Sequence, residues 1–112
     1  MLKIESAQYN DVIIISLDGT LVFNETAEAE KYYLEVLSRK PRVVALDCKK
    51  LANLDSSGLG IFIRYKKEAA RLNIQLIFLE ITGHVSTLFD SSKLSNMFEM
   101  MSEKEFKDAY LP

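Results

Sequence analysis

Three largely apolar stretches predict the buried strands of this chain. They cover Val12–Leu17, Val43–Leu46 and Ile74–Leu79, and the first is rich in β-branched residues. Continuous apolar strands are typical of a sheet whose two faces are both covered. Two weaker patterns predict shorter strands, because apolar and polar residues alternate over Leu2–Ser6 and Met97–Met101 is again apolar.

Apolar residues at helical spacing predict helices between these strands. The first helix begins at Asn24 or Thr26, either of which is a suitable cap, and runs to about Ser38. Its expected buried face is made of Ala29, Tyr33, Val36 and Leu37. Pro41 prevents a simple continuation of this helix.

Three more helices are expected further along the chain. One follows Asp55 and runs to about Leu72, and the next begins at the capping residue Thr82. A short terminal helix begins where Ser102 and Glu105 have the spacing of a capping box.

Two polar segments predict interruptions of the strands. Asp18-Gly19 is a turn signal that separates the first buried strand from a short strand over Leu21–Phe23. Lys49–Asn53 predicts a polar loop after the second buried strand. Strands come first, and helices and strands then alternate, which predicts one α/β layer structure with a mixed sheet.

Composition narrows the class of protein. The chain has 112 residues, of which 48% are hydrophobic and 27% charged, with a formal net charge of −2. This length suits one domain over residues 1–112, and the charge argues against a nucleic-acid partner, which needs a basic surface. Cys48 has no partner for a disulfide, and neither a signal peptide nor a membrane span is apparent. We therefore expect a cytoplasmic protein that does not insert into membranes.

The segment D-S-S-G-L-G at Asp55 to Gly60 is the most unusual in the chain. It holds two of the four glycines, although glycine in a helix costs up to about 1 kcal/mol relative to alanine. One interpretation is structural: a polar side chain caps the helix and a glycine permits a tight entry. The other is functional, because a loop between a strand's carboxyl end and a helix is where ligands and partners dock in α/β sheets.

Several catalytic and metal-binding chemistries fit this segment poorly. A hydrolase elbow needs G-x-S-x-G, but Asp55 and Leu59 stand where the two glycines around Ser57 would be, and His84 is the single candidate base. The dinucleotide and Walker patterns fail because Gly60 is followed by neither the third glycine nor a lysine. Single Cys and His residues do not form a metal site. We expect no metal, no cofactor and no enzymatic activity.

The stretch L-D-C-K-K-L-A-N-L-D-S-S-G-L-G-I-F-I-R-Y-K, from Leu46 to Lys66, resembles the signature of the STAS domain. It is most similar to the bacterial anti-sigma factor antagonists. The resemblance continues more weakly through G-T-L at Gly19, T-A-E at Thr26 and V-S-T-L-F-D at Val85. It implies a mixed sheet with helices packed mainly on one side, and it favours the functional interpretation of the hexapeptide.

In this family the serine directly before the glycine is phosphorylated by a serine/threonine kinase that is also the anti-sigma factor. That position is Ser57 here, and Ser56 is a secondary candidate. The resemblance implies that the unphosphorylated form binds the kinase and that a serine phosphatase resets the switch. It also implies a signal-transduction role in the regulation of transcription by partner switching.

The remaining site residues surround this serine. Asp55 is expected to cap the helix, with a direct kinase contact as its alternative role, and Gly58, Leu59 and Ile61 are expected to form the docking rim, although Leu59 also suits the core. Many members of the family carry an acidic residue after G-x-L, where this chain has Val22; Asn24 or Glu25 can substitute in part.

Two other functions stay open at this point. One is a STAS component of another signalling or transporter complex without a sigma factor. The other is a nucleotide-binding module whose Ser57 loop cradles a phosphate at the helix start.

Overall fold

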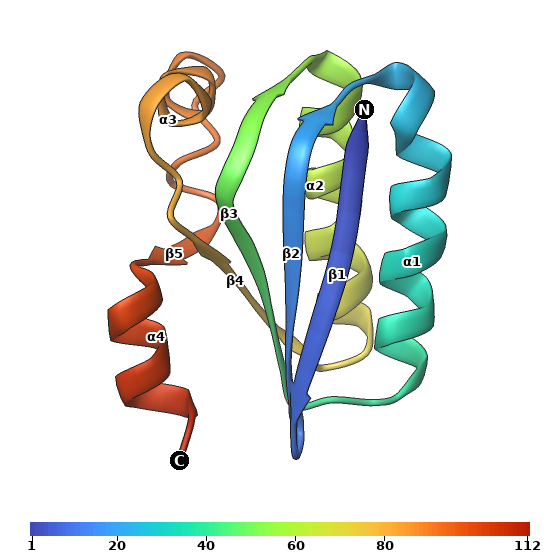
Figure 1. Cartoon of the computed structure of the whole chain (residues 1–112), viewed down its shortest axis with the longest axis vertical. Helices are drawn as coiled ribbons and strands as arrows, with labels where there is room; N and C mark the ends of the chain where they lie inside the picture. The colour runs from blue at the N-terminus through green and yellow to red at the C-terminus, as the bar shows by residue number, and fades with distance from the viewer.

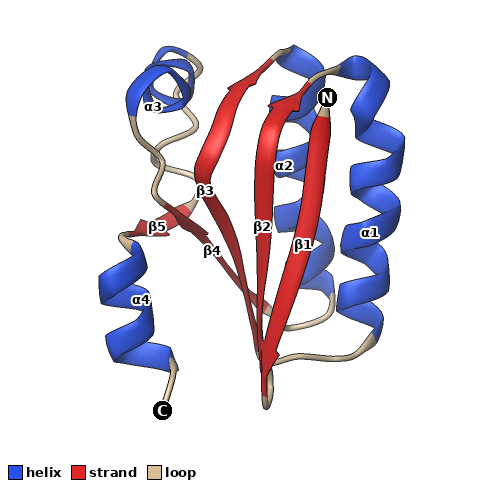
Figure 2. Cartoon of the chain, in the orientation of Figure 1, coloured by secondary structure: helices blue, strands red, loops and turns tan.

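The computed structural model describes residues 1–112 and contains one five-stranded sheet with four α-helices (Figures 1 and 2). The strands lie in the order in which they occur along the chain: β1 (Leu2–Tyr9), β2 (Val12–Leu21), β3 (Val43–Leu54), β4 (Gln75–Leu79) and β5 (Glu99–Met101). The helices are α1 (Thr26–Ser38), α2 (Ser56–Arg71), α3 (Gly83–Ser91) and α4 (Glu103–Tyr110), and a 3-10 helix over Phe23–Glu25 precedes α1.

The sheet is mixed because β1 runs antiparallel to β2, whereas β2, β3, β4 and β5 are parallel to one another. The helices α1 and α2 cover one face of the sheet, and α4 lies at the other face (Figure 1). The predicted mixed α/β sheet with helices mainly on one side is therefore confirmed. The carboxyl ends of β2 and β3 and the beginnings of α1 and α2 all lie at one end of the sheet, at the top of Figure 1.

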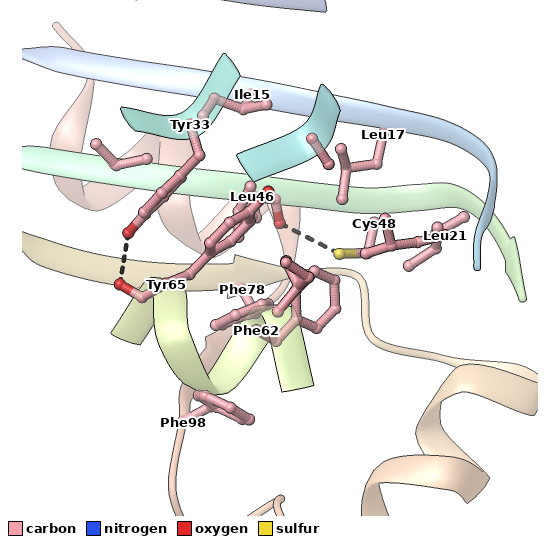
Figure 3. Packing of buried hydrophobic residues seen from close by; sticks show 14 of the residues in the cluster. Ile15, Leu17, Leu21, Tyr33, Leu46, Cys48, Phe62, Tyr65, Phe78 and Phe98 are labelled. Carbon is pink, nitrogen blue, oxygen red and sulfur yellow. Dashed lines mark hydrogen bonds between the residues drawn. The ribbon is translucent and has the colours of Figure 1, made fainter. Parts of the chain in front are cut away.

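The main core lies between the sheet and helices α1 and α2 (Figure 3). Tyr33 of α1 and Tyr65 of α2 stack with ring centroids 3.8 Å apart, and the Tyr33 hydroxyl donates a hydrogen bond of 2.7 Å to the Tyr65 carbonyl oxygen. Phe62 packs edge-on against Phe78 of β4, with centroids 4.9 Å apart. These contacts fix α2 on the sheet, and every member of the predicted α1 face is buried.

A smaller core covers part of the opposite face. Phe106 of α4 is fully buried against residues of β2, β3 and β4. The predicted capping box at the start of α4 is confirmed, because Ser102 and Glu105 exchange both hydrogen bonds.

The predicted turn at Asp18-Gly19 and the separate strand at Leu21–Phe23 are wrong. β2 continues through both residues to Leu21, and the irregularity is absorbed as shifts in its register with β3. Gly19 has φ +116°, and a Cβ atom there would lie 2.1 Å from the Met1 carbonyl oxygen. The glycine therefore serves a bulge and a close approach of two strands rather than a turn.

The predicted polar loop at Lys49–Asn53 is also wrong, because these residues extend β3. The extended parts of β2 and β3 pair with each other, since Gly19 pairs with Leu51 and Leu21 with Leu54. The side chains of Leu51 and Leu54 are buried, while Ala52 and Asn53 between them are exposed.

Two of the predicted helix caps are not formed. Glu25 occupies the cap position of α1, Asn24 lies in the 3-10 helix, and the Thr26 hydroxyl donates to the Phe23 carbonyl oxygen at 2.9 Å. The preceding 3-10 turn takes over the entry to α1, which explains the difference. Thr82 does occupy the cap position of α3, but its side chain makes no capping bond.

Burial makes the lone cysteine unreactive. Cys48 lies in the main core, where its thiol faces the Leu46 carbonyl oxygen at 3.7 Å (Figure 3). Burial raises the pKa of this thiol, so the group stays protonated at neutral pH.

None of the helices has the length and apolar character needed to cross a bilayer.

Candidate functional site

The D-S-S-G-L-G segment lies where β3 ends and α2 begins. Leu54, the last residue of β3, pairs with Leu21, the last residue of β2, and the Asp55 N–H donates to the Leu21 carbonyl oxygen at 3.4 Å. The loop that leads into α2 therefore lies beside the loop that leads from β2 into α1. Because parallel strands bring their carboxyl ends to one edge, these two loops form a common surface at that end of the sheet.

Asp55 joins the two loops through its two carboxylate oxygens. Its Oδ1 accepts a hydrogen bond of 3.0 Å from the Gly58 N–H, which makes Asp55 the cap of α2. Its Oδ2 accepts a hydrogen bond of 3.1 Å from the Phe23 N–H in the neighbouring loop. One side chain therefore fixes both the start of α2 and the backbone of the β2–α1 connection.

The two glycines of the hexapeptide differ in their surroundings. A Cβ atom on Gly58 would lie 2.4 Å from the Leu21 carbonyl oxygen and 2.9 Å from the Leu54 Cβ. Glycine at this position lets the first turn of α2 press directly against the strand ends. A Cβ atom on Gly60 would meet nothing within 4 Å, so the packing of this chain does not require that glycine.

Ser56 and Ser57 occupy the first two positions of α2. Ser56 is exposed, Ser57 is partly exposed, and neither hydroxyl makes a hydrogen bond to the protein. The amide groups of a helix's first turn have no partners within the helix and carry partial positive charge. The Ser57 hydroxyl is therefore reachable from solvent and lies where a negative group would be stabilised.

No lysine or arginine stands in residues 20–28 or 53–61, the two loop segments around Ser57, although the N-terminal ammonium of Met1 lies 3.9 Å from Glu25 at the same end of the sheet. Glu25, Glu28 and Asp55 are acidic. Within these two segments an anion on Ser57 would have only backbone amides as donors of positive charge, and it would increase the negative charge that the segments already carry.

Ile61 does not lie on the docking rim, contrary to the prediction. Its side chain is 0% exposed and belongs to the main core, because the inward face of α2 contains Ile61, Phe62 and Tyr65. Gly58 is buried as well, so it contributes close packing rather than surface. Leu59 is partly buried against the main core, and Asn24 is exposed at the same end of the sheet.

Sequence reasoning missed Phe23 as a surface residue. The prediction placed it in a short strand, but its side chain is 68% exposed in the 3-10 helix before α1. Its N–H donates to Asp55, so the backbone of Phe23 lies beside the start of α2. The sequence did contain a signal against a strand at this point. The segment V-F-N-E has no regular alternation of apolar and polar residues, and its aromatic residue stands next to polar and acidic ones.

The comparisons with known proteins identify relatives with this architecture. The family model described as STAS domain matches residues 3–107. A Bordetella bronchiseptica protein named "Putative anti-sigma factor antagonist BtrV" is 21% identical over 104 residues, which cover 93% of this chain and 90% of that protein.

Solved structures show the same fold. TM1081 of Thermotoga maritima has a TM-score of 0.85 at 14% identity, with 94% of this chain and 92% of that chain covered. The anti-sigma factor antagonist SpoIIAA of Bacillus, in its unphosphorylated form, has a TM-score of 0.72 at 18% identity and covers 96% of both chains.

Proposed function

Because the chain belongs to the STAS domain family, we propose that it is an anti-sigma factor antagonist controlled by phosphorylation of Ser57. In this proposal the unphosphorylated form binds a serine/threonine kinase that is also an anti-sigma factor. Phosphorylation by that kinase ends the interaction, and a serine phosphatase restores it. The chain itself acts as a binding module without catalytic activity.

The accessible hydroxyl of Ser57 is the observation that carries the proposal. It lies at the start of α2, partly exposed and free of hydrogen bonds to the protein. A buried serine would be closed to a kinase, and a serine engaged in capping would lose that bond on modification. Asp55 performs the capping instead, which leaves Ser57 available.

The fold is compatible with both states of this switch. A phosphoryl group adds about −1.5 to −2 charges at neutral pH, and the free amides of the first turn of α2 suit that charge. SpoIIAA, the relative known in both forms, resembles this chain equally well in each, with TM-scores of 0.72 unphosphorylated and 0.71 phosphorylated. We therefore expect the phosphate to act on the partner contact and its immediate surroundings without changing the overall fold.

Local charge explains how a partner would be released. The phosphate would meet no basic side chain from the two site loops, and a partner surface packed there would have to bury it next to Asp55. A buried anion without a cationic partner is costly. Each loss of about 1.4 kcal/mol in binding free energy lowers affinity tenfold, so a few kcal/mol suffice to separate the complex.

Gly60 gives independent support for a docking surface. Nothing in this chain occupies the space where its side chain would be, yet glycine in a helix costs up to about 1 kcal/mol. A partner that approaches the first turn of α2 closely explains why this space is kept open. Natural sequences retain such locally unfavourable residues at functional sites.

The test begins with the protein from its native cell. Intact-mass analysis should show a species heavier by one phosphoryl group, and peptide mapping should place it on Ser57. Ser57→Ala should abolish this species and bind the kinase constitutively, whereas Ser57→Asp should weaken binding at least tenfold. Ser56→Ala tests the secondary candidate, and this variant should still be phosphorylated on Ser57. Full phosphorylation of Ser57→Ala by the same kinase would refute the assignment.

A second candidate function rests on a structural likeness. A sulfate transporter family protein from Wolinella succinogenes has a TM-score of 0.70 to this chain, with 88% of this chain and 83% of that chain covered. On this alternative the same surface serves a complex without a sigma factor. Affinity capture with the wild-type chain, followed by mass spectrometry, separates the two by the partner recovered: a kinase or a transporter.

A further inference from the structure

Phe23 is the most exposed aromatic residue of the chain, and it lies at the candidate site. Its side chain is 68% exposed, and the 3-10 helix that carries it contains no buried residue. Leu34 on α1 and Met97 before β5 are also exposed but lie elsewhere in the fold. The chain-terminal Met1, 98% exposed, lies beside Thr20 and Glu25 at the same end of the sheet as Phe23. Large aromatic side chains dominate the energetics of protein interfaces, particularly where they lie at the centre of the contact.

Asp55 fixes the position of Phe23 relative to the phosphoacceptor. The carboxylate holds the Phe23 N–H at 3.1 Å with one oxygen and the Gly58 N–H at 3.0 Å with the other. Ser57 lies between Asp55 and Gly58 in sequence. The backbone at Phe23 and the first turn of α2, which carries Ser57, are therefore joined by a single side chain, so a surface that covers one segment lies next to the other.

From this arrangement we propose that Phe23 is the apolar anchor by which the kinase partner holds this end of the sheet, and that Asp55 positions it. The partner accordingly offers an apolar socket beside the region that receives Ser57. The inference rests on the proposed function and adds the residue that supplies binding energy to it. Asp55 is a positioning residue in this account, because it acts through the Phe23 backbone.

This arrangement also suggests how phosphorylation of Ser57 affects the Phe23 segment. A phosphoryl group on Ser57 places negative charge within two residues of the Asp55 carboxylate, and like charges repel. The pair of hydrogen bonds that Asp55 makes to the two loops is then the local structure most affected. The backbone of Phe23 would lose this hydrogen bond in the same event that places charge in the interface.

The decisive variant is Phe23→Ala. The probe is the purified serine kinase that phosphorylates Ser57 of the wild-type chain. We expect the dissociation constant of the unphosphorylated chain to rise about 30-fold, the loss typical of an aromatic hot spot, with a parallel fall in kcat/KM for phosphorylation. Phe23→Leu should recover most of the affinity. Leu34→Ala, which truncates a side chain 44% exposed on α1, is the matched control and should bind as wild type.

The positioning role of Asp55 has its own readout. In Asp55→Asn one of the two acceptor oxygens becomes an amide nitrogen, which cannot accept a hydrogen bond, so one of the two bonds is lost. The nuclear magnetic resonance signal of the Phe23 amide should shift and its hydrogen exchange should accelerate. In a double-mutant cycle with Phe23→Ala, the effects of the two substitutions on affinity should be less than additive.

The possible failures are distinguishable. Wild-type affinity and phosphorylation of a folded Phe23→Ala variant would overturn the anchor and leave the proposed function intact. Additive effects of the two substitutions, with an unchanged Phe23 amide in Asp55→Asn, would overturn the positioning role. If no kinase phosphorylates Ser57, the proposed function fails and the anchor fails with it.

Discussion

The two faces of α2 obey different requirements within one helix. Its inward face contains Phe62 and Tyr65, which stack and interlock with aromatic rings from α1 and β4. Its outward face at the amino end carries unengaged serine hydroxyls and Gly60, whose missing side chain would meet only empty space. The first face is packed into the core, whereas the second leaves open space beside the serine hydroxyls. A helix held along one side by aromatic packing can therefore keep the other side free of contacts within the chain.

Removal of a buried aromatic ring from the inward face of α2 should cause the largest loss of stability. Phe62 is fully buried and packs against Phe78 at 4.9 Å and Phe89 at 6.0 Å between ring centroids. We expect Phe62→Ala to lower the free energy of unfolding by about 3–5 kcal/mol, because it removes buried apolar contacts and leaves a cavity. Urea denaturation measures this loss. A change below about 1 kcal/mol would show that α2 is not held by its aromatic face.

Gly58 lies on the inward side of the first turn, so adding one methyl group there should be the next most damaging change. The Cβ atom of Gly58→Ala would lie 2.4 Å from a backbone oxygen, that of Leu21, which cannot move without displacing the end of β2. We expect a loss of about 1–3 kcal/mol of stability. The displaced first turn should also slow phosphorylation of Ser57, which a kinase assay on folded protein measures.

Gly60→Ala is the matched substitution on the outward side and should have the opposite sign. The added Cβ atom meets nothing within 4 Å, and alanine is the better helix former. We expect stability to rise by about 0.5–1 kcal/mol. Thermal unfolding measures the gain, and affinity for the kinase should fall if the partner uses this space. Equal effects of the two glycine substitutions on stability would contradict the distinction between the faces.

Several features of the fold were predicted correctly from local sequence patterns. The three apolar stretches predicted β2, β3 and β4, and the spacing of Ala29, Tyr33, Val36 and Leu37 predicted the buried face of α1. The capping box of α4 was predicted from Ser102 and Glu105 because both bonds are local. The hexapeptide at Asp55 was found because two glycines contradict the helix that follows them.

Other features depended on contacts between distant segments. Lys49–Asn53 belongs to β3 because the extended β2 pairs with it, and no local pattern reports the length of a neighbouring strand. Ile61 was assigned to the surface because the hydrophobic face of α2 was not known to pass through it. The bond from Phe23 to Asp55 spans 32 residues, so only the assembled fold could reveal it.

The sequence by itself determined the order of helices and strands, the buried stretches and the unusual segment D-S-S-G-L-G that contains Ser57. Those features follow from local propensity and periodicity, which act between residues close in the chain. Only the tertiary structure decided which glycine is sterically required, which apolar side chains stay outside the core and which side chain links the two site loops. These three features depend on contacts between segments that meet only when the parallel strands pair. Local sequence patterns do not determine which distant segments come into contact.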